Sequence, residues 1–216
     1  MKMGKNKAMN LVITGFAGSG KGTQAKLLAK KYDIPHISMG EIFRDIRKQD
    51  TGLGRRVKEI IDNGRLVPDD TTNQIVAERI SRPDCEQGFV LDGYPRNLVQ
   101  AEFLDKQADI TKCIYLEVSE EEVIKRLSTR RICPACKTEY NLLYVKPEQD
   151  DKCDKCGAEL VQRDDDKPDA IRQRLKIFYD KTSKIIDFYD SKGVLLRING
   201  GQPIKKVFED IVAGLG

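Results

Sequence analysis

The sequence predicts an α/β protein with a parallel five-stranded sheet that carries helices on both faces. Two observations support this fold class. Short apolar runs, typical of buried strands, alternate along the chain with segments of helical spacing, and no internal repeat is present. A glycine-rich turn joins the first apolar run to the first helical segment, as in P-loop nucleoside triphosphate enzymes. The expected strands are residues 11–13, 36–38, 88–92, 113–118 and 194–198.

Length and composition are those of one globular domain with small inserts. The chain has 216 residues, of which 39% are hydrophobic and 33% charged, and its net charge of +4 is too small to indicate nucleic-acid binding by itself. Residues 1–9 carry lysines without a following apolar stretch, so we expect a disordered tail before a domain at 10–216, and no signal peptide. No run is long enough to cross a membrane. We therefore expect a cytoplasmic protein with reduced thiols.

The turn at residues 15–23 has the features of a phosphate-binding loop. Glycines allow backbone N–H groups to close around phosphate oxygens, and the following helix N-terminus adds unpaired donors. Lys21 supplies a cation for the outer phosphates, whereas Gly22 stands where the common pattern has Ser or Thr, and the hydroxyl follows at Thr23. A chance glycine-rich loop is disfavoured by the strand and helix on either side. The residues expected at the phosphates are Gly18, Ser19, Gly20, Lys21, Gly22 and Thr23.

Between the second and third expected strands, the sequence predicts helices. Ser38 and Glu41 form a capping box at the start of one helix, and a second helix covers 51–63. Asp70 or Thr71 is expected to cap a third helix that runs through Ile80. His36 is the one histidine of the chain, and without a nucleophile near it in sequence we expect a structural role.

The segment at residues 88–96 is a buried strand that ends in Asp92, followed by Gly93, Tyr94, Pro95 and Arg96. Parallel strands deliver functional groups at their carboxyl ends, so Asp92 is placed to hold the water shell of Mg²⁺. The alternative is that Asp92 only forms the turn. The Tyr94–Pro95 bond is a candidate cis peptide. A helix at 97–106 follows.

The second half of the chain continues the alternation. Ser119 and Glu122 form another capping box, after the strand at 113–118. Pro168 begins a long helix whose apolar stripe reaches Tyr189. The last strand leads through a turn at 199–203 into a final amphipathic helix.

Four of the six cysteines form two Cys-x-x-Cys pairs separated by sixteen residues. In a reducing compartment this spacing predicts a zinc site, and four thiolates leave no open position, so the ion is structural. Disulfides or unrelated thiols are the alternative. The expected ligands are Cys133, Cys136, Cys153 and Cys156. The insert that holds them, at 132–161, also has strand-like stretches at 138–140 and 159–161.

Cations lie at or near the ends of several expected elements. Phosphoryl transfer needs two substrates held in line, Mg²⁺, and cations on the transferring group. Arginines at both ends of the zinc insert would make it a suitable lid that excludes water, although arginines near a helix end often form only a solvated face. The residues concerned are Lys21, Arg44, Arg96, Arg130, Arg163 and Arg174.

These motifs together resemble the adenylate kinases that carry a zinc-bearing lid. The resemblance covers nearly the whole chain from residue 10, in family order, and the Gly22–Thr23 pair is part of the family pattern. The matching stretches are 18–24, 91–96 with Gln100, Arg130–Arg131 before Cys133, 163–165, and 172–174.

The resemblance implies a nucleoside-monophosphate-binding insert at 38–67 and a lid at 129–166, in a monomer that converts ATP and AMP to two ADP with Mg²⁺. Arg130, Tyr140 and Gln202 would border ATP beside the P-loop. Asp92 and Asp165 would be partners of Mg²⁺ or of arginines. The residues implied around AMP are Met39, Arg44, Arg65, Leu66, Val67, Gly93, Tyr94, Pro95, Arg96, Gln100, Arg163 and Arg174.

Two departures from the family pattern bear on the substrate. Ala17 replaces a usual proline, and Met39 replaces a usual Thr or Ser beside the acceptor base. Because a related family that acts on UMP and CMP also lacks this hydroxyl, a kinase for another nucleoside monophosphate is the alternative. A nucleic-acid-binding zinc ribbon is a further alternative, but it would need basic and aromatic residues around the cysteines, and the insert instead mixes acidic residues with its lysines.

Overall fold

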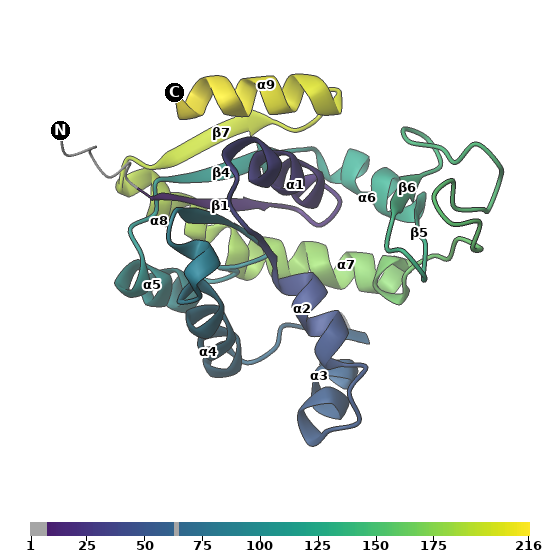
Figure 1. The fold of residues 1–216 in the computed structure, drawn as a ribbon, viewed down its shortest axis with the longest axis horizontal. Helices are drawn as coiled ribbons and strands as arrows, with labels where there is room; N and C mark the ends of the chain where they lie inside the picture. The colour runs from purple at the N-terminus through teal and green to yellow at the C-terminus, as the bar shows by residue number, and fades with distance from the viewer. Residues whose placement is uncertain (1–7, 63–64) are drawn as a thin grey trace.

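The computed structural model describes residues 8–62 and 65–216 of the chain. Within them, a five-stranded sheet has the order β2-β3-β1-β4-β7, and every neighbouring pair is parallel. This confirms the predicted fold class, and it places β1 at the centre of the sheet (Figure 1). The strands are β1 Met9–Gly15, β2 His36–Ser38, β3 Gly88–Asp92, β4 Lys112–Glu117 and β7 Leu195–Asn199.

Helices fill the connections between the strands, and several begin at the expected caps. The hydroxyl of Ser38 accepts a hydrogen bond from the backbone N–H of Glu41, and Ser119 does the same for Glu122. The helices are α1 Lys21–Tyr32, α2 Met39–Ile46, α3 Gly52–Asp62, α4 Asp69–Ile80, α5 Leu98–Gln107, α6 Glu120–Ser128, α7 Pro168–Ile177, α8 Lys184–Ser191 and α9 Ile204–Leu215, with short turns η1 Pro83–Cys85 and η2 Asp164–Asp166.

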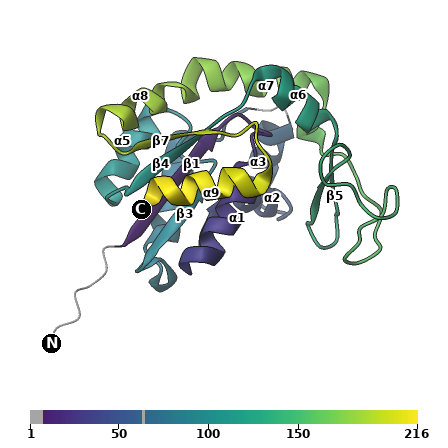
Figure 2. The ribbon, with the colours of Figure 1, turned by 90° about the horizontal axis from the view of Figure 1, so that it is seen from above.

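The sheet is the middle of three layers. One face packs against α1 and α9, through side chains such as Leu28 and Ile211. The other face packs against α4, α5 and α8, through side chains such as Leu104 and Ile185. Near-continuous apolar strands such as β1 are required here, because both faces of a central parallel strand are buried. Figure 2 shows α9 over one face, with α5 and α8 on the opposite side.

Three details differ from the sequence-based expectations, and one expected helix end lies outside the described residues. Met9 belongs to β1, so the expected tail at 1–9 is at least two residues too long, and its residues 1–7 lie outside the described part of the chain. Helix α4 begins at Asp69 with Pro68 before it, rather than with a cap at Asp70 or Thr71. The expected strand at 159–161 makes only isolated bridges. Asn63, the expected end of the second helix, is not among the described residues.

The long helix expected from Pro168 to Tyr189 is interrupted by a π-helical turn, η3 Phe178–Thr182. This turn lies against the active-site loops. The Phe178 ring packs on Phe16 with ring centroids 4.0 Å apart, and the Thr182 hydroxyl donates a hydrogen bond to the carbonyl oxygen of Arg96 at 2.9 Å. Such turns are frequent at functional sites, since they redirect side chains without ending the helix.

Two segments extend from the core, one downward and one to the right in the view of Figure 1. Helices α2 and α3 form one, and the chain between α6 and α7 forms the other, with an antiparallel pair β5 Arg130–Ile132 and β6 Glu139–Asn141 (Figure 1). The chain leaves for this second segment at Arg130 and returns at Asp166, and the two side chains are paired, with Arg130 Nε 2.7 Å from Asp166 Oδ2. The two ends of the second segment therefore lie side by side.

Candidate active site

A cavity of about 780 Å³ lies at the carboxyl ends of the central strands. Its wall is formed by the P-loop, by α2 and residues 65–67, by the segment between α6 and α7, and by residues 200–204. In β1 and β3, Ile13 and Asp92 are register neighbours, so the chain positions the P-loop and the Asp92 carboxylate next to each other. This is the edge at which parallel α/β sheets bind ligands.

The P-loop is held open by its glycines. Gly18 and Gly20 have φ of 82° and 98°, a region that L-residues with side chains rarely adopt. A Cβ at Gly18 would also lie 2.8 Å from Leu127 Cγ, so this position admits only glycine without displacement of α6. Gly22 also lies close to β3, because a Cβ at this position would be 3.4 Å from the Asp92 carboxylate.

Lys21 lies at the bottom of this loop. Its ammonium group donates hydrogen bonds to the carbonyl oxygens of Gly15 and Phe16, at 3.0 and 2.6 Å. Burial lowers the pKa of Lys21 to about 8, although the nearby Asp92 carboxylate opposes this shift. The loop therefore presents a cation whose charge has lost most of its contact with water.

Asp92 faces His36 of the neighbouring strand, with His36 Nε2 3.4 Å from Asp92 Oδ2. Burial disfavours the charged carboxylate, but the nearby His36 side chain and the charge of Lys21 outweigh it, and the pKa of Asp92 is lowered. Sequence reasoning missed this partner of Asp92, because nothing in the sequence shows that His36 and Asp92 are opposite each other across two strands.

Arginines and aspartates alternate where the second segment rejoins the core. Asp165 accepts hydrogen bonds from Arg163 at 2.7 Å and lies 3.1 Å from Arg174. The guanidinium groups of Arg174 and Arg163 hold the pKa of Asp165 well below its usual range, against the effect of burial. Burial lowers the pKa of Arg174 to about 10. Sequence reasoning placed Asp165 here, but missed Asp166.

Asp166 is fully buried and is paired with Arg130 and Arg174, at 2.5 and 3.2 Å between nitrogen and oxygen. The signal available in the sequence was the run of three aspartates at 164–166, of which the first two belong to the matching stretch 163–165 and only Asp165 was given a role. The burial of Asp166 follows from the path of the chain at η2, which the sequence does not reveal.

Three cations on the cavity wall, Lys21, Arg44 and Arg96, form no ion pair with a carboxylate among residues 8–62 and 65–216. Burial lowers the pKa of both Arg44 and Arg96. Arg96 is oriented by its own Nε, which donates to the carbonyl oxygen of Gly93 at 2.9 Å. Half-buried cations of this kind are stabilised by an anionic partner, and a phosphate group could supply one.

The residues expected around the acceptor base fall into two groups. Those that line the cavity are Arg65, Leu66, Val67, Gly93, Pro95 and Gln100. The amide of Gln100 is already engaged, since its oxygen accepts from Arg96 N–H at 2.8 Å and its nitrogen donates to Asp69 at 2.7 Å.

Met39 and Tyr94 are not among the lining residues. Met39 is fully buried in the core beneath α2, and Tyr94 is buried with its hydroxyl donating to Asn73 at 2.7 Å. Both side chains pack behind the wall rather than on it, because α2 turns its apolar side to the core. The peptide bond between Tyr94 and Pro95 is cis.

On the opposite side of the P-loop, the expected residues Arg130, Tyr140 and Gln202 line the cavity. Four further residues there were not predicted as site residues: Glu122, Arg126, Asn141 and Tyr144. Arg126 was visible only as one of several arginines near a helix end. Its ion pair with Glu122 is an i,i+4 pair on α6, whereas its other partners, the carbonyl oxygens of Gly200 and Ser19, come from distant sequence positions.

The four cysteine sulfurs form one cluster in which every pair lies within 4.8 Å. The Sγ atoms of Cys133 and Cys156 are 3.4 Å apart, as are those of Cys136 and Cys153. A tetrahedral zinc ion with Zn–S bonds of about 2.3 Å holds sulfurs about 3.8 Å apart, so the donor set fits this ion. The cluster lies on its own small core with Tyr140 and Leu160, at a distance in sequence from the P-loop.

No helix in the described ranges, 8–62 and 65–216, is both long and apolar enough to cross a membrane.

Comparison with known proteins agrees with this geometry. The family model described as adenylate kinase matches residues 13–194. Adenylate kinases from Thermotoga maritima and from Caldanaerobacter subterraneus subsp. tengcongensis are each 47% identical over 212 residues, which is 95% and 96% of this chain and 96% of each relative. The adenylate kinase of Archaeoglobus fulgidus is 47% identical over 210 residues, 95% of this chain and 97% of the relative. The chain therefore belongs to the adenylate kinase family.

Proposed function

We propose that this protein catalyses reversible phosphoryl transfer from ATP to AMP, which yields two ADP. The observation that carries the proposal is the set of half-buried cations on one cavity, Lys21, Arg44 and Arg96, none of which forms an ion pair with a carboxylate in the described part of the chain. Phosphoryl transfer depends on positioning and on charge stabilisation of this kind. Membership of the adenylate kinase family supports the same reaction.

The donor triphosphate would bind at the P-loop. Its backbone N–H groups at 18–23 and the N-terminus of α1 face the cavity, and Lys21 would move from the loop carbonyls to the phosphates. Arg130, Tyr140 and Gln202 would border the remainder of ATP. Arg130 now contacts Asp166, so a phosphate that enters would share or replace this partner.

The acceptor would bind on the side of α2. Arg44 and Arg96 would bind its phosphate, while residues 65–67 and Gln100 would border its base. Arg163 and Arg174 reach the same region from the other side and would stabilise the transferring group. Attack would be direct and in line, without a phosphorylated enzyme.

Two metals fit this assignment. Mg²⁺ accompanies the triphosphate in this class of reaction and neutralises its charge, and the ionised Asp92 is the residue that would hold its water shell. Zinc fits the four-cysteine cluster as a structural ion, because all four positions are filled by thiolates. Neither ion is needed to explain the position of the arginines.

The inserts at 38–67 and 129–166 would act as the mobile parts of the enzyme. Closure of the second as a lid would exclude water, and would thereby prevent wasteful hydrolysis of the triphosphate. We further propose a cytoplasmic monomer that acts on free nucleotides, without nucleic-acid or membrane partners.

The deciding experiment compares AMP, CMP, UMP and GMP as acceptors at saturating ATP. The proposal expects AMP to be phosphorylated at the highest kcat/KM. Preference for UMP or CMP would instead make the protein a pyrimidine nucleoside monophosphate kinase on the same fold. Hydrolysis of ATP without transfer to any acceptor would contradict both.

A further inference from the structure

A cluster at the boundary between core and lid is unused by the proposed phosphate contacts. It consists of Glu122 and Arg126 of α6 and of Tyr144 from the turn after β6; we call it the Glu122 cluster. Glu122 Oε1 accepts hydrogen bonds from Arg126 Nε and from the Tyr144 hydroxyl, each at 2.7 Å. The Arg126 guanidinium lies over the Tyr144 ring, 5.6 Å from its centroid. All three residues line the cavity.

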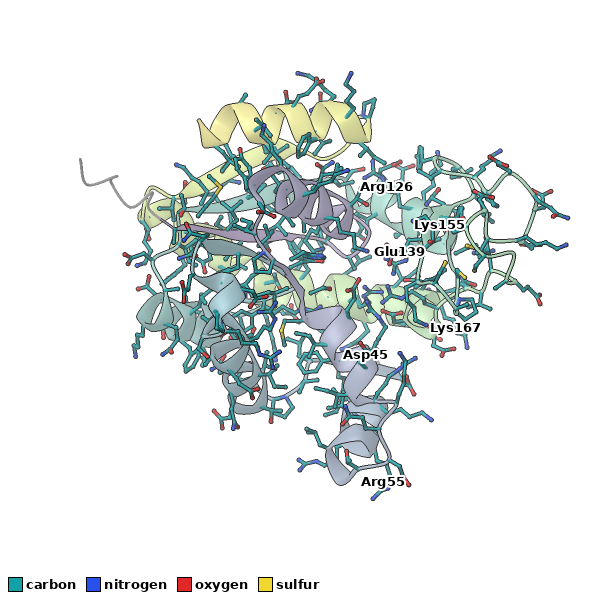
Figure 3. The ribbon with its side chains drawn as sticks, viewed as in Figure 1. Asp45, Arg55, Arg126, Glu139, Lys155 and Lys167 are labelled. Carbon is teal, nitrogen blue, oxygen red and sulfur yellow. The ribbon has the colours of Figure 1, made fainter. Side chains whose placement is uncertain are left out.

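Arg126 connects this cluster to the donor side of the site. Its Nη1 donates to the carbonyl oxygen of Gly200 at 3.0 Å and lies 3.5 Å from that of Ser19 in the P-loop. Its side chain is 17% exposed, so the guanidinium is held on several sides. Figure 3 shows Arg126 between the core and the lid. The orientation of Arg126 therefore affects both the P-loop and the loop at 200–202.

The lid turn that carries Tyr144 is fixed at its other end by Asn141. The Asn141 amide donates to the carbonyl oxygen of Arg126 at 2.9 Å and accepts from the backbone N–H of Leu143 and Tyr144. The backbone N–H of Leu142 donates to the carbonyl oxygen of Thr129 at 3.0 Å. The start of the turn is thus attached to the end of α6. The Tyr144–Glu122 hydrogen bond attaches the other side of the turn to α6 one helical turn before Arg126.

We propose that Glu122 is a positioning residue for the donor nucleotide, which ties the lid turn to the core and holds Arg126 in place at the donor end of the cavity. One oxygen of Glu122 accepts hydrogen bonds from both the Tyr144 hydroxyl and the Arg126 guanidinium. The position of the lid turn and the orientation of the guanidinium therefore depend on the same atom. Arg126 contacts Gly200, and the following residues Gly201 and Gln202 also line the cavity. The inference rests on the proposed function, because it names the donor side by the P-loop.

Electrostatics support the arrangement. Burial raises the pKa of Glu122, but the hydrogen bonds from Tyr144 and Arg126 outweigh it and the pKa is lowered. Lys125 on the same helix adds in the same direction. The carboxylate therefore stays ionised at neutral pH, and charge-assisted bonds of this kind are stronger than neutral ones.

The chain offers a matched control on the same helix. Glu120 Oε2 accepts a hydrogen bond from the Tyr179 hydroxyl at 3.1 Å, and Tyr179 and Tyr144 are both 53% exposed. This second pair joins α6 to η3 and does not line the cavity. The Tyr179–Glu120 hydrogen bond therefore has the same chemistry as the Tyr144–Glu122 bond but lies outside the cavity.

The test measures KM for ATP and AMP, kcat, and the dissociation constant of a non-hydrolysable ATP analogue. Tyr144→Phe removes only the hydroxyl and is expected to raise the ATP KM and the analogue Kd about threefold, and Glu122→Leu about tenfold, as loss of hydrogen bonds to a charged group predicts. Glu122→Gln keeps the accepting oxygen and should recover most of the affinity. The AMP KM and kcat should change less than twofold, and the double variant Glu122→Leu/Tyr144→Phe should be no worse than Glu122→Leu.

The controls Tyr179→Phe and Glu120→Leu should leave all donor parameters at their wild-type values. Unchanged donor affinity in both Tyr144→Phe and Glu122→Leu would overturn the inference, and so would equal losses in the control pair. If the wild-type chain binds the analogue but makes no ADP from AMP, the proposed function fails while the analogue Kd still decides the role of Glu122. A wild-type chain that binds no analogue would overturn both.

Discussion

Lys21 Nζ lies 2.6 Å from the carbonyl oxygen of Phe16, so the P-loop holds the cation with its own backbone. The loop thereby keeps the ammonium group within the bend where phosphates would bind. Lys21→Met should lower kcat by at least about a thousandfold, because removal of a single charged donor from a dry site has effects of this order. The melting temperature should not fall, since the variant removes a charge that burial disfavours. A kcat near wild type, with the fold verified by circular dichroism, would contradict the P-loop assignment.

The pKa of about 8 for Lys21 predicts a pH dependence of donor binding. The folded pKa lies below the ordinary lysine value of 10.5, so the free enzyme loses this charge as pH rises through about 8, while the unfolded chain keeps it. The kcat/KM for ATP, which reports on the free enzyme, should therefore fall above pH 8. In Lys21→Arg the guanidinium stays charged, and any residual activity should lack this decline. A wild-type profile that stays flat to pH 10 would refute the assignment.

Arg96 is expected to act chiefly in the transition state. It is oriented by Gly93 and forms no ion pair with a carboxylate in the part of the chain that the structure describes, so a phosphate is its natural partner. Arg96→Ala should reduce kcat/KM, and the loss should correspond to roughly 3 to 4 kcal/mol of transition-state stabilisation. Arg82→Ala is the control, since Arg82 is exposed and paired with Glu78 on the surface. Steady-state kinetics decide, and similar losses in both variants would argue against a specific role.

Zinc removal should affect stability more than chemistry. The cluster of Cys133, Cys136, Cys153 and Cys156 is closed, and its small core is separate from the P-loop. Chelation should lower Tm, by roughly 2–4 °C for each kcal/mol lost in a chain of this size. Cys153→Ala should have the lower Tm from the start and should no longer respond to the chelator. An unchanged Tm after verified metal loss would contradict a structural ion.

Met39 is expected to matter for stability and not for the choice of acceptor. Its side chain is fully buried in the core beneath α2, whereas its neighbours Ser38 and Gly40 line the cavity. Met39→Ala should reduce the free energy of unfolding by about 2–5 kcal/mol, with the ratio of AMP to CMP turnover unchanged. Urea unfolding and acceptor kinetics provide the two measurements. A changed acceptor ratio at wild-type stability would return Met39 to the binding site.

The parts of the site that the sequence predicted are those whose chemistry is local. The P-loop, the carboxylate at the end of β3 and the two Cys-x-x-Cys pairs are each contained within a short stretch of sequence, so residue spacing alone identifies them. Four of the five strands were placed for the same reason, because each contains a contiguous apolar run. Errors of one or two residues at helix and strand ends arose where capping was carried by Pro68 or by backbone alone.

The parts that the sequence did not predict depend on contacts between distant positions. His36 is 56 residues from Asp92 and reaches it only because β2 and β3 are neighbours. Asp166 becomes a buried partner of Arg130 across 36 residues. The π-helical turn η3 contacts Phe16 and Arg96, which lie far from it in sequence. Met39 was placed on the cavity by family pattern alone, while its inward direction follows from the orientation of α2.

The pairing of Arg130 with Asp166 also has an evolutionary consequence. Because the chain departs and returns at adjacent points, the segment between them can grow, shrink or be exchanged for a tight turn without any strand of the sheet having to move. Evolution can then change the segment between Arg130 and Asp166 independently, while the sheet and the P-loop stay unchanged. Shortening the chain between these two residues and measuring the stability of what remains would show how far the cassette is separable.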